Sequence, residues 1–194
     1  MLADIQPTTW TVSDISASAK GAKTAQINAN GSPPQVRFAT PEEPLHAVFE
    51  PSSYDPAQTR HNVDLNVPPY LEDFMGRADA WAMALLLKES PRFFKRQVSK
   101  EELHLMYQSC LKKHSKDDKI YPDTVRCKIN TTGPKQLRVW SFAHESRAPP
   151  EAYRHCDLVP MVTFKNLWFS ANTCGIVLEI ADMMVREQTT SCPF

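Results

Sequence analysis

Basic and aromatic side chains alternate in the second half of the chain, where they could form a binding surface. Arg126 and Lys128 alternate with apolar neighbours, so they should share one face of a strand. Arg138, Trp140 and Phe142 repeat this spacing further along the chain. Single-stranded nucleic acids are held by basic grooves that follow the phosphates and by aromatic rings that stack on the bases. A face combining these side chains would suit such a ligand.

The turn residues Thr131–Pro134 separate the two segments and predict that they form a hairpin. Two orientations of the second strand fit the alternation equally well. In one, Trp140 joins the basic face. In the other, Trp140 and Phe142 point into the core while Leu137 and Val139 point outward.

A second candidate surface lies near the C-terminal end, where Lys165 and Trp168 occupy one long apolar segment. Trp168 has the same parity as Val162 and Phe164, and this favours a position in the core. The alternative is that Trp168 stacks on a base.

Motifs of catalysis and metal binding are missing from the sequence. It has no G-x-G-x-x-G or Walker loop and no G-x-S-x-G elbow. Its cysteines and histidines lack the C-x-x-C and H-x-x-x-H pairs typical of zinc sites. We therefore expect a binding protein rather than an enzyme, with no metal and no cofactor.

The formal net charge of the 194 residues is zero, but the charges are unevenly distributed. Residues 38–87 carry two basic and eight acidic side chains, a net charge of −6. Residues 88–138 carry thirteen basic and six acidic side chains, a net charge of +7. The basic segment predicts either a surface for an anionic partner or an ordinary solvated helix face.

The five cysteines are an odd number without close spacing, which favours reduced thiols and an intracellular location in nucleus or cytoplasm. No stretch approaches the roughly 20 apolar residues that a membrane span requires, so we expect no membrane association.

The elements that would position these residues form an ordered series. Asn30-Gly31 predicts a hairpin between short strands at 25–28 and 35–39. A half-buried strand is expected at 61–67, and a long helix should follow Pro68. A second helix, capped by Ser99 and Glu102, should extend to Lys113. The remaining strands are expected at these positions: 125–129, 136–142, 158–169 and 176–185.

This order of strands, two helices and strands predicts an α+β fold. Short hairpin-connected strands can close into a small antiparallel barrel of the OB type, here with a two-helix insert at 68–114. We expect a single domain over residues 10–186, with flexible tails at 1–9 and 187–194.

Four short segments, spread between Gln26 and Val185, resemble the single-stranded DNA-binding proteins of large eukaryotic DNA viruses, including algal and giant viruses. The segments are Val36–Pro41, His61–Val67, Tyr121–Ile129 and Leu158–Met184. The resemblance implies an OB-like barrel that coats single-stranded DNA during viral replication. Lys128 and Trp168 match a basic and an aromatic position of the family.

The resemblance also favours DNA over RNA as the ligand. Arg37, in the first segment, completes the set of predicted nucleic-acid-binding residues. These are Arg37, Arg126, Lys128, Arg138, Trp140, Lys165 and Trp168.

Two further hypotheses concern protein partners. A non-enzymatic interaction scaffold is the rival to nucleic-acid binding, with the apolar strand at 158–169 or the proline-rich loops as docking surfaces. The chain also ends in Pro193-Phe194, and a terminal aromatic residue on a flexible tether can insert into an apolar pocket of a replication partner.

Overall fold

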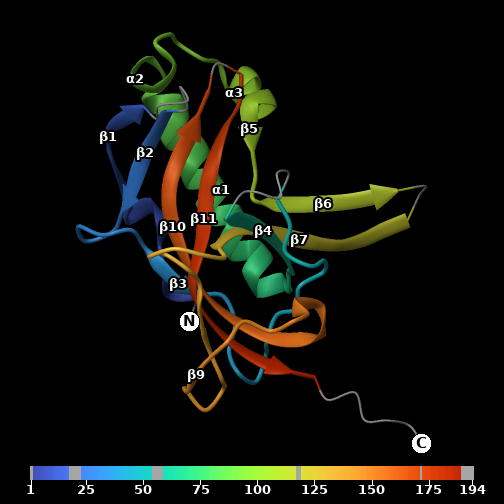
Figure 1. Cartoon of the computed structure of the whole chain (residues 1–194). Helices are drawn as coiled ribbons and strands as arrows, with labels where there is room; N and C mark the ends of the chain where they lie inside the picture. The colour runs from blue at the N-terminus through green and yellow to red at the C-terminus, as the bar shows by residue number, and fades with distance from the viewer. Residues whose placement is uncertain (1, 18–22, 54–58, 117–118, 171, 189–194) are drawn as a thin grey trace, which may run out of the picture. The chain divides into compact units, whose positions relative to one another are not determined.

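The computed structural model describes residues 2–17, 23–53, 59–116, 119–170 and 172–188 (Figure 1). The chain divides into two compact units. Unit 1 comprises Met1–Gln35, Pro68–Lys112 and Thr163–Leu178, and unit 2 comprises Val36–Val67, Lys113–Val162 and Glu179–Phe194. Both contain strands, and the α-helices of the described residues lie in unit 1, so the predicted α+β class is confirmed.

The three helices all lie in unit 1, within the predicted helical segment. They are α1 (Pro69–Lys88), α2 (Ser90–Phe94) and α3 (Lys100–Met106). The apolar spacing of residues 71–86 predicts one buried stripe on α1, and all its members except the half-buried Leu85 are buried: Leu71, Phe74, Met75, Ala78, Trp81, Ala82 and Leu86. Ser99 caps α3 as expected, because its hydroxyl oxygen accepts the backbone N–H of Glu102 at 3.1 Å.

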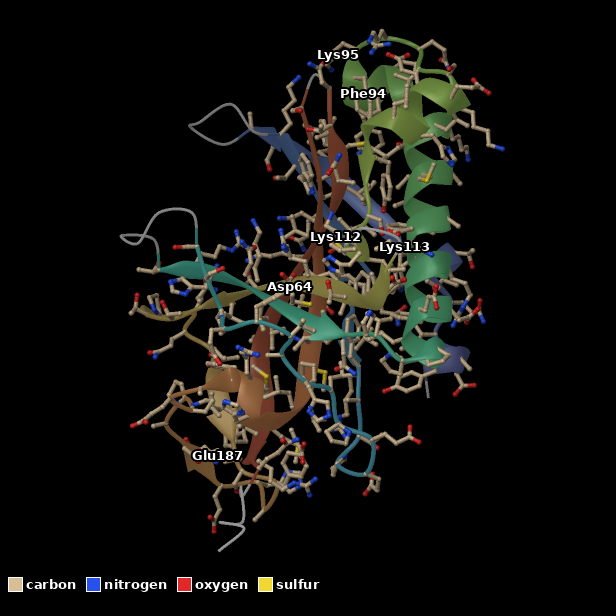
Figure 2. The ribbon with its side chains drawn as sticks, turned by 90° about the vertical axis from the view of Figure 1, so that its right-hand side faces the viewer. Asp64, Phe94, Lys95, Lys112, Lys113 and Glu187 are labelled. Carbon is tan, nitrogen blue, oxygen red and sulfur yellow. The ribbon has the colours of Figure 1, made fainter. Side chains whose placement is uncertain are left out.

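The second helix is shorter than predicted. It ends at Met106, and the chain continues as β5 (Tyr107–Gln108) and β6 (Leu111–Lys116). The side chains of Tyr107 and Ser109 both donate hydrogen bonds to Asp79 of α1, at 2.7 and 2.5 Å. These tertiary bonds and the pairing of β5 outweigh local helix propensity, so Lys112 and Lys113 lie on a strand (Figure 2).

The sheet of unit 1 contains, in order, β1 (Thr11–Ala17), β2 (Lys23–Asn28) and the first-unit parts of β10 (Cys156–Phe169) and β11 (Cys174–Glu187), with β5 on β11. Helix α1 packs on it through aromatic contacts, since the rings of Phe74 and Phe164 are 5.7 Å apart. Trp10 lies 4.8 Å from Phe164 and 5.4 Å from Trp81. These rings form the core that holds β10 in place.

The segment expected as an N-terminal tail forms two short 3-10 helices, Leu2–Asp4 and Pro7–Thr9. Arg77 of α1 donates hydrogen bonds to the carbonyl oxygens of Leu2 at 3.1 Å and Ile5 at 2.7 Å. This segment is therefore tied to α1.

Unit 2 is built on β7 (Lys119–Asn130), which pairs with β6 and runs antiparallel to β4 (Arg60–Asn66). The second half of β11 pairs in parallel with β7 and then with β8 (Arg138–Trp140). Strand β9 (Ser146–Arg147) pairs with β8. The expectation of an entirely antiparallel sheet is therefore wrong, since β11 has parallel partners.

Both predicted internal hairpins are also wrong, for the same physical reason. Strands β2 and β3 (Gln35–Arg37) both pair with β10, and strands β7 and β8 both pair with β11. The Asn30-Gly31 turn does form, with positive φ angles of 53° and 87°, but the chain then resumes its direction. Likewise, the N–H of Leu137 donates to the carbonyl of Asn130 at 2.8 Å and closes the second loop. Each turn sequence therefore forms a loop between two strands that pair with the same neighbour, and it does not reverse the chain into a hairpin.

The closing hairpin was predicted correctly. Strands β10 and β11 are sheet neighbours. The N–H of Ser170 donates to the carbonyl of Thr173 at 2.8 Å in the turn between them.

Candidate nucleic-acid interface

The four tryptophans divide into two buried and two partly exposed residues. Trp10 and Trp81 expose 6% and 8% of their surface, whereas Trp140 and Trp168 are half-buried. The two tryptophans predicted to stack on bases are thus the two that are not buried. One belongs to each unit, and we describe their surroundings separately.

In unit 2, burial settles the orientation that alternation left open. Leu137 and Val139 are buried, so Arg138 and Trp140 lie on the opposite face of β8. On β7 the alternate residues Val125, Cys127 and Ile129 are buried, as predicted. Arg126 and Lys128 therefore lie on the face opposite the core.

Strand β11 brings these two groups onto one face. Lys128 is the register partner of Glu179, and Arg138 is the partner of Asp182. The inward residues Ile180 and Met183 are three positions apart, so the alternation changes phase between them. Glu179 and Asp182 consequently lie on the same side. We call this side of unit 2 the Trp140 face.

Most arginines of the Trp140 face are already paired with carboxylates. Arg126 forms two hydrogen bonds of 2.8 Å with Asp64 of β4, which Figure 2 labels. Arg138 contacts Asp182 at 2.6 Å. Arg60 contacts Glu179 at 2.6 Å. Such pairs orient the guanidinium groups and neutralise part of their charge, although at a surface each stabilises the fold by only about 0–1 kcal/mol.

A hollow of about 300 Å³ opens on the Trp140 face. Its lining residues come from β3, β8, β10, β11 and the loop after β8, and they are Arg37, Trp140, His144, Val159, Met161, Asp182, Met183 and Met184. The indole N–H of Trp140 donates to Asp182 Oδ1 at 3.1 Å. The predicted residue Arg37, which is exposed, thereby lies in the same hollow as Trp140.

In unit 1, the parity argument that placed Trp168 in the core is wrong. Phe164 is buried, but so are Leu167 and Phe169, so the alternation of β10 changes phase after Phe164. Trp168 therefore faces away from the core, with Thr24 as its register partner on β2. Lys165 lies at the phase change and is half-buried. We call this surface the Trp168 face.

Trp168 lies against a glycine. A Cβ atom added to Gly175 would be 3.1 Å from Trp168 Nε1 and 2.6 Å from the backbone oxygen of Gln108 on β5. Glycine thus leaves room for the indole and for the β5–β11 pairing at one point. Asn166, beside Gln26 on β2, belongs to the same outer surface.

The structure thus places five of the seven predicted residues in unit 2, with Arg37 and Trp140 lining one hollow, and the other two in unit 1. Sequence reasoning missed the acidic partners Asp64, Glu179 and Asp182. The alternation of residues 61–67 already put Asp64 on a polar face, but pairing across strands is needed to place it beside Arg126.

A second hollow in unit 2, of about 460 Å³, has a different chemistry. Its lining includes Glu50 and Glu151, which suit phosphate poorly. The Glu50 carboxylate accepts the backbone N–H groups of Tyr153 and Arg154 at 2.9 and 3.0 Å, so it supports the local fold.

In the part of the chain that the structure describes, no group of three or more His, Cys, Asp or Glu side chains could hold a metal ion. No helix among these residues is long and apolar enough to cross a membrane.

The docking strand proposed for a scaffold is not an open edge. Residues 158–169 belong to β10, which has β2 and β3 on one side and β11 on the other. Phe194, the predicted terminal hook, lies outside the described residues.

Comparison with known proteins finds likeness only among solved structures. A scan against family models and a search of the curated proteins both give no significant match. The single-stranded DNA-binding protein of bacteriophage Enc34 is similar with a TM-score of 0.48 and 12% identity, covering 92% of this chain and 97% of that one. The single-stranded DNA-binding protein gp2.5 of bacteriophage T7 is similar with a TM-score of 0.47 and 14% identity, covering 82% and 94%. Likeness at this level transfers no function, so a function has to be inferred from the chain's own residues.

Proposed function

We propose that this chain binds single-stranded DNA without catalysing a reaction, and that Trp140 and Trp168 stack on its bases. The observation that carries the proposal is that these two tryptophans are only half-buried on strand faces, whereas Trp10 and Trp81 are buried. Base stacking on an aromatic ring is favourable by about 1–3 kcal/mol per base and tolerates any sequence.

The basic residues beside the indoles would contact the phosphates. Arg37 and Lys128 lie on the Trp140 face, and Lys165 lies on the strand that bears Trp168. Arg126 and Arg138 would exchange a carboxylate for a phosphate, so the loss of the carboxylate partner offsets part of the attraction that each adds. Binding should therefore depend on salt, but only moderately.

The finer parts of the proposal rest on the family resemblance in the sequence. They are an OB-like barrel, membership of the viral single-stranded DNA-binding family, DNA rather than RNA as ligand, and protection of single strands during replication inside the cell. A competition between DNA and RNA oligonucleotides of the same sequence tests the ligand preference directly.

Tryptophan fluorescence tests the main proposal, because stacking on a base quenches an exposed indole. A thymidine tract of about 15 nucleotides is long enough for the site sizes of such domains. We expect saturable quenching that weakens as salt increases. Quenching that persists in the Trp140→Phe, Trp168→Phe double variant, or affinity that ignores salt, would contradict the proposal.

For Phe194 we propose recruitment of a replication partner. Deletion of Pro193 and Phe194 should abolish partner recovery in a pull-down while leaving oligonucleotide affinity unchanged. Unchanged recovery would refute the hook, and a loss of DNA affinity would assign the C-terminus to DNA binding instead.

A further inference from the structure

The hollow on the Trp140 face has an apolar wall beside a hydrogen-bonding group. Val159 and Met184 are buried, and Met161 is half-buried beside them. The Trp140 indole borders the same space. Thioether and aliphatic side chains next to an aromatic ring suit a flat, polarisable ligand.

Asp182 holds the Trp140 indole by a hydrogen bond, and its carboxylate can accept a further hydrogen bond. Its Oδ1 accepts the Trp140 N–H at 3.1 Å, and its Oδ2 accepts Arg138 Nη2 at 2.6 Å. A carboxylate has about four lone-pair positions, so two donors do not saturate it. The side chain is 28% exposed, so a ligand entering the hollow can reach it.

Two further groups border the opening. Arg37 is exposed on β3 and suits a phosphate. His144 has a φ of 64°, which is uncommon for a residue other than glycine, and its N–H donates to the carbonyl of Ser141 at 3.0 Å. The Ser141 hydroxyl oxygen also accepts the N–H groups of Ala143 and Glu145, so a tight turn holds His144 at the hollow.

We propose that this hollow takes one nucleobase inserted beside Trp140, and that Asp182 accepts a hydrogen bond from the exocyclic amino group of cytosine. A carboxylate accepts from the N4 amino group of cytosine but faces a carbonyl oxygen at the same position of thymine or uracil. The inference rests on the proposed single-stranded DNA binding and adds a base preference to it. Stacking at Trp168 carries no such preference.

Three tracts of equal length and charge test the inference at neutral pH: oligo-dC, oligo-dT and oligo-dU of about 15 nucleotides. The electrostatic contribution is common to all three. We expect oligo-dC to bind about three- to tenfold more tightly than the other two, the range for the net contribution of one additional hydrogen bond. Replacing cytosine by N4,N4-dimethylcytosine should abolish the advantage, because it removes both amino protons.

Asp182→Asn should reduce the preference for oligo-dC, since the amide is a weaker acceptor than the carboxylate. Asp64→Asn is the matched control, because Asp64 also pairs with an arginine on the Trp140 face but is not part of the hollow. That variant should keep the wild-type preference. The comparison of natural and dimethylated cytosine in the wild-type protein holds even if Asp182→Asn does not fold.

The outcomes separate the two proposals. Equal affinity for the three tracts would overturn the base preference while leaving single-stranded DNA binding intact. Equal affinity for oligo-dU and oligo-dC, with weaker binding of oligo-dT, would also overturn it, because exclusion of the thymine methyl group would then be the cause. Failure of all three tracts to bind would overturn both proposals.

Discussion

The Trp140 and Trp168 faces each present one indole, but they support it in different ways. Trp140 is held by a hydrogen bond to Asp182, among arginines that are paired with carboxylates. Trp168 lies on Gly175, beside the polar neighbours Thr24 and Asn166. The ring of Trp140 is thus positioned by electrostatics, and the ring of Trp168 by close backbone approach.

The difference teaches that an exposed aromatic residue does not define a binding surface by itself. On the Trp140 face, mutation of an acid should change the charge offered to DNA. On the Trp168 face, mutation of Gly175 should change where the indole ring lies.

The largest effect is expected for Gly175→Val. The new Cβ would meet the backbone oxygen of Gln108 at 2.6 Å, and the backbone there cannot move without loss of the β5–β11 pairing. We expect a loss of about 3 kcal/mol in the free energy of unfolding, at the upper end for overpacking. Chemical denaturation measures it.

Gly76→Ala is the control for that substitution. Gly76 lies on α1 with open space around it, so alanine should stabilise the protein by up to about 1 kcal/mol. Equal stability of Gly175→Val and wild type would mean that Trp168 does not depend on the glycine.

Removal of either exposed indole should weaken DNA binding by about 1–3 kcal/mol. Trp140→Ala and Trp168→Ala are compared with Phe49→Ala, which removes an aromatic residue that is 57% exposed but belongs to neither face. Anisotropy titrations with labelled oligo-dT give the affinities. If only one tryptophan variant loses affinity, the other face is not part of the interface.

Asp79 should make stability depend on pH, because burial raises the pKa of its carboxyl group above the ordinary value of 3.8. The folded state then holds this proton more tightly than the unfolded state. The stabilisation that this gives is complete below the ordinary pKa and is lost as pH rises through the folded pKa.

Asp79→Asn should therefore gain stability relative to wild type as pH rises from about 3 to about 7. Thermal melts of both proteins across this range measure the difference. Asp73→Asn, on the same helix but with a side chain that is 72% exposed, is the control for removing one carboxylate from α1. Since Asp79 anchors Tyr107 at the start of β5, a constant difference would mean that this support of the Trp168 face is insensitive to protonation.

The smallest effect is expected for Asp64→Asn, which releases Arg126 from its carboxylate partner. We expect about threefold tighter binding of oligo-dT at low salt, because one more cation can neutralise a phosphate. The slope of log affinity against log salt should steepen by about 0.7, from roughly −2.1 for the three phosphates that Arg37, Lys128 and Lys165 contact in the wild type. Weaker binding than wild type would show that Asp64 is needed to position Arg126.

Local sequence patterns determined several elements of this protein and the faces on which their side chains lie. The spacing of apolar residues predicted α1, the Ser99 cap predicted the start of α3, and alternation put Arg126 and Lys128 on the face opposite the core. These features depend on side chains a few residues apart, whose relative positions the helix or strand period already sets.

Only the tertiary structure decided which strands pair and which charges meet. Sequence cannot tell a turn that reverses the chain from one that protrudes, so β7 and β8 were expected to face each other although both lie on β11. The sequence also does not show where the inward–outward alternation of a strand changes phase. Such a change in β10 is the reason why Trp168 faces away from the core. The pairing of Arg126 with Asp64 joins residues 62 positions apart, and their contact depends on strand register, which the packing of the whole sheet sets.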